Sequence, residues 1–80
     1  MTGFLVEYHR PTGNWSVQEF PGASGRRDAL EASFKLERDR ASSDFEIAVL
    51  ATDSIKTLQQ THSRYFSGRQ QSPGFSGLAA

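Results

Sequence analysis

The chain has 80 residues, no cysteine, and nine basic residues balanced by nine acidic ones. This length fits one small domain, and the lack of cysteine excludes a disulfide framework, a thiolate zinc site and a cysteine nucleophile. Zero net charge argues against a general nucleic-acid coat or a polybasic membrane binder, and no apolar run approaches the length of a membrane span. We therefore expect a small cytoplasmic domain without membrane contact.

A β-hairpin is predicted at the start of the chain. Residues 4–10 and 15–20 alternate apolar and polar side chains with the period of a strand. The intervening Pro-Thr-Gly-Asn segment supplies turn residues. Closing the hairpin around Thr12 and Gly13 brings apolar side chains together on the same face. This register pairs Tyr8 with Val17, Glu7 with Gln18 and Leu5 with Phe20.

A helix, a third strand and a second helix are predicted to follow. Ser24 can cap a helix that continues to about Arg40, residues 44–52 alternate as a strand, and residues 55–66 have a helical apolar pattern. The order ββαβα with a right-handed crossover predicts an α+β fold, whose three-stranded antiparallel sheet has the strand order 2-1-3. Both helices are expected mainly on the face that carries Phe4, Val6, Phe45 and Ile47.

The last fourteen residues, 67–80, are expected to form a flexible tail. They are rich in Gly, Ser and Gln, and only Phe75 and Leu78 could bury much apolar surface. That burial is too small to offset the entropy of ordering the segment. The predicted domain therefore covers residues 1–66.

The C-terminus has one short motif. Leu78-Ala79-Ala80 resembles the terminal Leu-Ala-Ala of bacterial tmRNA-encoded degradation tags. The resemblance implies recognition by an ATP-dependent unfoldase and protease, which need an unstructured end to grip. A small-residue tail without function is the alternative.

The sheet face away from the predicted helices contains the main candidate interaction site. In the order 2-1-3, Leu5 lies between Phe20 on one neighbouring strand and the pair Ala48 and Leu50 on the other. An uncovered apolar patch of this kind is typical of an association surface. A folded unit of about 64 residues also has a marginal core, which oligomerisation can support. The two outer strands leave further edges open for strand addition.

Trp15 and Arg10 are expected to extend this surface at the hairpin end, where the predicted register makes them neighbours. Tryptophan and arginine are enriched in binding hot spots, and stacking of the two is favourable. In an alternative interpretation, Trp15 joins Arg26 and Arg27 in a stacking platform for nucleic acid. Zero net charge and an acidic third strand weigh against that alternative.

Catalytic motifs are absent from the sequence, which has no P-loop, dinucleotide fingerprint, nucleophile elbow or histidine pair at metal-binding spacing. We therefore expect no catalytic residues, no metal, no cofactor and no small-molecule substrate. Glu37 and His62 lie on the apolar stripes of the two predicted helices, and would form a buried polar pair if the helices packed side by side. Separate structural roles at the helix margins are the alternative.

The sequence thus predicts a non-enzymatic protein-interaction module that binds itself or another protein. Nucleic-acid binding is the alternative function. Seven arginines against two lysines in a short chain would suit a bacterial or bacteriophage accessory protein.

Overall fold

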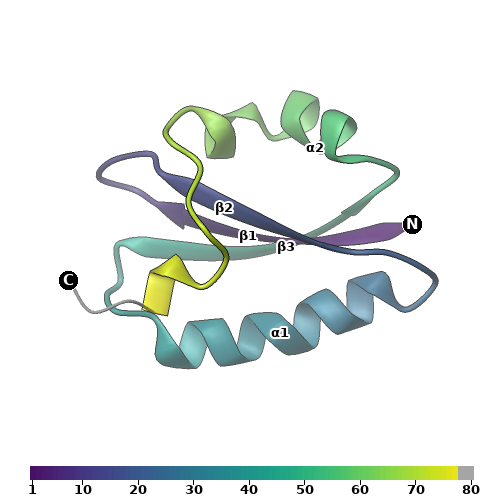
Figure 1. The fold of residues 1–80 in the computed structure, drawn as a ribbon, viewed down its shortest axis with the longest axis horizontal. Coiled ribbons are helices and arrows are strands. Elements are labelled where there is room, and N and C mark those ends of the chain that lie inside the picture. The colour runs from purple at the N-terminus through teal and green to yellow at the C-terminus, as the bar shows by residue number, and fades with distance from the viewer. Residues whose placement is uncertain (78–80) are drawn as a thin grey trace.

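A computed structural model describes residues 1–77 of the chain, in which a three-stranded sheet lies between two helical layers (Figure 1). The strands are β1 (Thr2–His9), β2 (Trp15–Phe20) and β3 (Phe45–Thr52). The helices are α1 (Gly25–Asp39) and α2 (Ile55–Thr61), with short 3-10 turns η1 (Ser63–Phe66) and η2 (Phe75–Gly77). The sheet is antiparallel with the order β2-β1-β3, which confirms the predicted α+β class and strand order.

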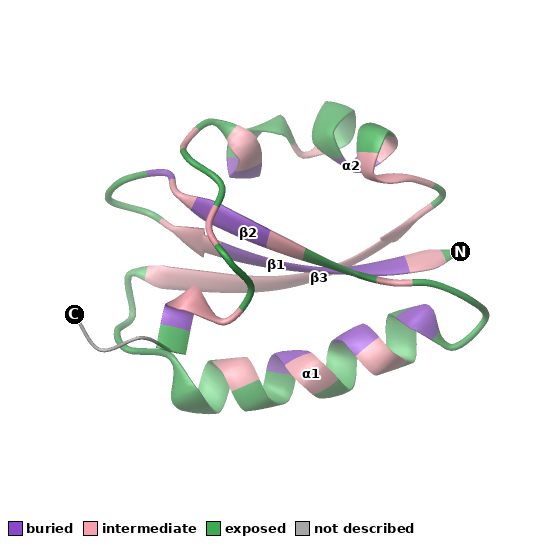
Figure 2. Cartoon of the chain, viewed as in Figure 1, coloured by how far each residue is buried: buried purple, intermediate pink, exposed green. Residues whose placement is uncertain are grey.

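The two helices cover opposite faces of the sheet, which corrects the expectation that both lie on one face (Figure 1). Leu58 of α2 packs against Phe4 and Val6 in the hydrophobic core. On the other face, a Cβ atom added to Gly3 would lie 2.3 Å from the carbonyl oxygen of Gly25, at the start of α1. Covering both faces gives β1 an unbroken run of five buried residues, which Figure 2 shows at the centre of the molecule.

The helix ends agree only in part with the expected caps. Ser54 caps α2 as predicted, since its Oγ accepts a hydrogen bond from the backbone N–H of Thr57 at 3.1 Å. Ser24 instead donates its hydroxyl to the carboxylate of Asp28 at 3.1 Å and caps no backbone group. The longer helix, α1, has 15 residues, and within the described part of the chain no helix could cross a membrane.

The hairpin register differs from the prediction by two residues. Tyr8 lies opposite Trp15 and Leu5 opposite Gln18, because the loop closes with the N–H of Gly13 donating to the carbonyl of His9 at 2.7 Å. Gly13 permits this tighter loop by adopting a φ of 76°. A shift of two residues keeps every side chain on its predicted face but separates the expected partners.

The register of β3 has a larger consequence, because it differs by one residue from the expected alignment. Phe4 lies opposite Leu50 and Val6 opposite Ala48. Ala48 and Leu50 therefore share the face beneath α2, and Ile47 lies on the face beneath α1. Both faces of β3 are apolar, so its hydrophobic pattern alone did not fix which face meets which helix.

The segment of residues 67–77, called here the C-terminal segment, packs against the hairpin instead of forming a free tail (Figure 1). The backbone N–H of Trp15 donates to the carbonyl of Arg69 at 3.0 Å, and the N–H of Gln71 donates to the carbonyl of Trp15 at 2.6 Å. The folded unit thus extends beyond the predicted boundary at residue 66. The Leu78-Ala79-Ala80 motif lies outside the described residues.

Candidate functional site

The apolar surface predicted on the sheet is not formed. Leu5 is only 2% exposed, because α1 covers its face. Ala48 and Leu50 lie on the opposite face and pack against the hydrophobic core. Phe20 is half-buried and lies opposite Gly3. These predicted partner-binding residues are thus divided between two covered faces, and the predicted site is wrong.

Trp15 and Arg10 are not stacked on one another. Trp15 is 8% exposed, packs edge-to-face on Phe66 with ring centroids 4.7 Å apart, and donates its Nε1–H to the carbonyl of Gly68 at 3.1 Å. Arg10 points to the other side, where its guanidinium donates to the carbonyl of Ser43. Trp15 therefore anchors the C-terminal segment and offers no exposed ring to a partner.

The nucleic-acid platform is likewise not assembled. Gly25, which precedes Arg26 and Arg27, abuts Phe20 at one end of β2, whereas Trp15 begins the strand at the other end. Five strand positions separate Trp15 from Phe20, about 17 Å at the usual rise per residue. The buried indole and the two arginines therefore cannot form one stacking surface.

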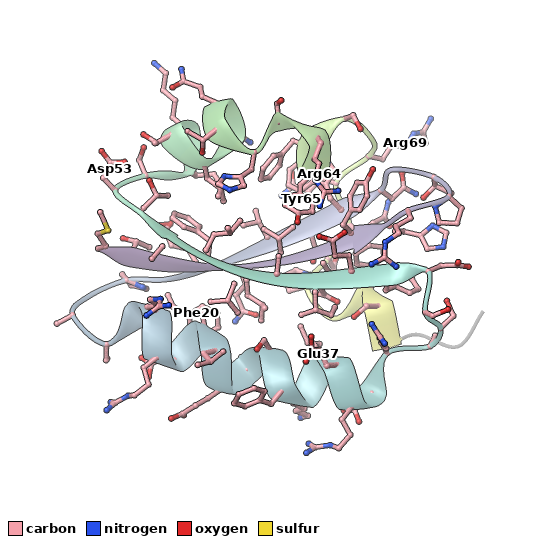
Figure 3. All side chains as sticks on the ribbon, turned by 180° about the vertical axis from the view of Figure 1, so that it is seen from behind. Phe20, Glu37, Asp53, Arg64, Tyr65 and Arg69 are labelled. Atoms are coloured by element: carbon pink, nitrogen blue, oxygen red, sulfur yellow. The ribbon has the colours of Figure 1, made fainter. Side chains whose placement is uncertain are left out.

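Glu37 and His62 do not meet either, because their helices lie on opposite sides of the sheet. Glu37 is exposed on α1, as Figure 3 shows. The Nδ1 of His62 lies 2.9 Å from the hydroxyl of Thr61, and its ring stacks on Tyr65 with centroids 6.4 Å apart. The predicted buried pair is wrong, and His62 has a local packing role.

A polar cluster around Glu46 was not predicted. The Glu46 carboxylate accepts hydrogen bonds from the hydroxyl of Tyr65 and from Nη2 of Arg64 at 2.8 Å, and the Nε of Arg10 lies 3.6 Å away. The Arg64 guanidinium lies 4.2 Å from the centroid of the Tyr65 ring. Figure 3 shows Arg64 and Tyr65 side by side above β3. The cluster therefore ties η1 to the edge of the sheet.

The electrostatics of this cluster favour the ionised form of the Glu46 carboxylate. Burial raises the pKa of Glu46, but hydrogen bonds from Tyr65 and Arg64 and the two neighbouring guanidinium charges outweigh it, so the pKa lies below its ordinary value. Burial and the hydrogen bond to Glu46 raise the pKa of Tyr65. The ionised carboxylate accepts hydrogen bonds from Arg64 and from the phenol of Tyr65, and these bonds hold η1 against β3.

Glu7 forms a second unpredicted cluster, on the face beneath α1. It is 2% exposed, and its carboxylate accepts hydrogen bonds from the Ser16 hydroxyl at 2.8 Å, the Gly74 N–H at 2.6 Å and both the N–H and hydroxyl of Ser76. Three of these four donors belong to the C-terminal segment. Glu7 therefore fastens that segment to the central strand, a contact between residues so distant in sequence that no local pattern could reveal it.

The outer edge of β3 has backbone groups that point away from the sheet. The backbone N–H of Arg10 donates to the carbonyl of Asp44 at 2.9 Å, which places Asp44 in a hydrogen-bonded pair with β1. Backbone groups alternate between the two sides of a strand, so even-numbered residues of β3 face β1 and odd-numbered residues face outward. The outward residues are Phe45, Ile47, Val49 and Ala51.

Only the first of these outward positions has partners within the described chain. The N–H of Phe45 donates to the carbonyl of Ser42 at 3.4 Å, and its carbonyl accepts a hydrogen bond from Arg40 at 3.2 Å. Across residues 1–77, no hydrogen bond or further strand engages the outward groups of Ile47, Val49 and Ala51. Figure 3 shows β3 as the strand nearest the viewer, with no other backbone segment across it.

The opposite edge of the sheet, on β2, is covered only at Trp15, since no hydrogen bond among residues 1–77 engages the outward backbone groups of Val17 and Glu19. The outward N–H and carbonyl of Trp15 are taken by the C-terminal segment, which crosses in front of β2 in Figure 1. The strand then continues with the exposed polar residues Gln18 and Glu19. Sheet edges are commonly protected by such coverage and polarity. The edge of β3 has neither, since residues 47–51 are all apolar and partly exposed.

The strand order predicts open edges on both outer strands, and the structure shows that the C-terminal segment covers one of them, β2, at Trp15. Comparisons with protein-family models, with curated proteins and with solved structures find no significant match to this chain.

Proposed function

We propose that this chain is a small, non-enzymatic protein-interaction domain that binds its partner by strand addition at the outer edge of β3. The observation that supports it is the row of outward backbone groups at Ile47, Val49 and Ala51, which have no partner in the described chain. Main-chain hydrogen bonds to an added strand would satisfy these groups.

The side chains of β3 favour a protein strand as the ligand. Ile47 and Val49 flank the edge on one face, and Ala48 and Leu50 flank it on the other. An incoming strand with apolar residues would extend the core beneath both helices and gain affinity from apolar burial. A phosphate backbone would find no cation along these residues. The proposal retains the expectation of a cytoplasmic domain.

The interaction can be tested by photo-crosslinking in cells that carry the gene. A photoreactive residue at Ala51, on the edge, should give adducts with a partner, whereas the same residue at Lys35, exposed on α1, should give none. Val49→Pro removes an outward N–H without touching the pairing with β1, and should abolish the adduct. Equal adducts at both positions, or an adduct that survives Val49→Pro, would contradict the proposal.

A further inference from the structure

We infer that the partner of the β3 edge is a second copy of this chain, paired antiparallel about a twofold axis at Val49. The two sheets would then form one sheet of order β2-β1-β3-β3-β1-β2. This inference rests on the proposed function and names the partner. Strand pairing about a twofold axis uses the same surface on both copies, as most homodimers do.

The register follows from the backbone groups that remain unpaired. In an antiparallel pair, outward-facing residues of one strand must oppose outward-facing residues of the other. Phe45 already has its partners, so Ile47, Val49 and Ala51 remain. Only one twofold register pairs all three, and it places Val49 opposite Val49 and Ile47 opposite Ala51.

The side chains are compatible with themselves in this register. On the face beneath α1, Val49 meets its own equivalent and Ile47 meets Ala51. On the face beneath α2, Ala48 meets Leu50. Each cross-strand pair is apolar, and no two like charges oppose one another.

Charge complementarity gives an independent argument for a second copy. Extending the register by one position, beyond the last hydrogen-bonded pair, sets Asp53, which directly follows β3, opposite Phe45 of the partner. Within each chain, Arg40 donates a hydrogen bond to the carbonyl of Phe45. Both Arg40 and Asp53 are exposed. Figure 3 shows Asp53 at the end of β3. The twofold axis would therefore bring Arg40 of each copy close to Asp53 of the other.

The oligomeric state provides the first test. By size-exclusion chromatography with light scattering, the wild type should have twice the chain mass of 8.9 kDa at micromolar to millimolar concentration. Val49→Pro should be a monomer with an unchanged circular dichroism spectrum. Phe34→Ser, at a side chain 57% exposed on α1, is the matched control and should remain a dimer. A monomeric wild type, or a dimer that tolerates Val49→Pro but not Phe34→Ser, overturns the inference.

Charge reversal tests the register without depending on the proline variant. Arg40→Asp and Asp53→Arg should each raise the dissociation constant of the homodimer about tenfold at low salt, because each sets like charges together twice. Mixing the two variants should restore wild-type affinity, since both contacts in the mixed dimer are again complementary. A mixture no tighter than either variant alone overturns the register.

These outcomes separate the partner from the proposed function. A monomeric wild type with an adduct at Ala51 that Val49→Pro abolishes would refute the second copy and leave strand addition to another protein in place. A wild type that is monomeric and gives no adduct at Ala51 would refute both the second copy and strand addition.

Discussion

Replacing Glu7 by glutamine should destabilise the whole domain, although it changes one oxygen to an amide nitrogen. The two carboxylate oxygens each accept two hydrogen bonds, and each receives one from a backbone N–H, Gly74 on Oε1 and Ser76 on Oε2. A serine hydroxyl can turn and accept from the new amide, but a backbone N–H cannot. Either orientation of the glutamine therefore sets its NH₂ group against an N–H donor.

The expected magnitude follows from this count. In the described residues no cation lies within ion-pair distance of Glu7, so its buried charge is stabilised by the four donors alone. Glu7→Gln loses at least one hydrogen bond outright and removes the charge assistance from the others. Hydrogen bonds to charged groups contribute about 1.5–3 kcal/mol each, so we expect a loss of about 2–4 kcal/mol.

Denaturant unfolding monitored by the fluorescence of Trp15 can measure this loss. Trp15 is the sole tryptophan and contacts the C-terminal segment, so the same signal reports the detachment of that segment. Glu19→Gln, at an exposed position of β2, is the matched control and should stay within about 0.5 kcal/mol of the wild type. A loss below about 1 kcal/mol for Glu7→Gln would refute the view that the carboxylate fastens the segment.

Three further predictions follow from the remaining contacts. The folded pKa of Glu46 lies below its unfolded value, so this group stabilises the fold above pH 4.5 and the stability is lost as the pH falls through the folded pKa. Tyr65→Phe should raise that pKa in an NMR titration and reduce the acid dependence of unfolding; an unshifted titration would contradict the cluster. Gly68→Ala would place a Cβ atom 2.3 Å from the Gly13 carbonyl, so the variant should lose about 1–3 kcal/mol of unfolding free energy. Trypsin should then cleave the C-terminal segment of the variant, whereas the wild type should resist cleavage there. Val49→Cys introduces a lone thiol, which should form an intermolecular disulfide under mild oxidation if Val49 lies at the twofold axis, and a thiol that stays reduced would contradict that register.

Local patterns predicted which elements form but not which faces meet. The alternation of residues 4–10 and 15–20, the turn between them and the Ser54 cap depend on neighbouring residues, and each is present in the structure. The faces of β3 could not be assigned in this way. Its apolar residues occupy both faces, so the hydrophobic pattern is compatible with either of two alignments that differ by one residue. The change of alignment moves Ala48 and Leu50 from the face beneath α1 to the face beneath α2.

The packing of α1 depends on the same tertiary contacts. Its buried residues are the small side chains Gly25, Ala29 and Ser33, which let the helix approach β1 closely. The larger Leu30 and Phe34 remain exposed. A hydrophobic stripe predicts burial of the large residues, whereas a close crossing of helix and strand favours the small ones.

The sequence by itself determined the α+β class, the order of elements and the strand order, because these follow from periodicity, turn residues and the handedness of the crossover. Only the tertiary structure decided that the helices lie on opposite faces, that the C-terminal segment packs onto the hairpin, and that this segment covers the edge of β2 at Trp15. The contacts that hold the C-terminal segment join Glu7 to Ser76 and Trp15 to Arg69, across more than 50 residues. Hydrogen bonds at that separation leave no periodic trace in the sequence, and they attach the C-terminal segment to β1 and β2 while the outward backbone groups of Ile47, Val49 and Ala51 stay unpaired within the described chain.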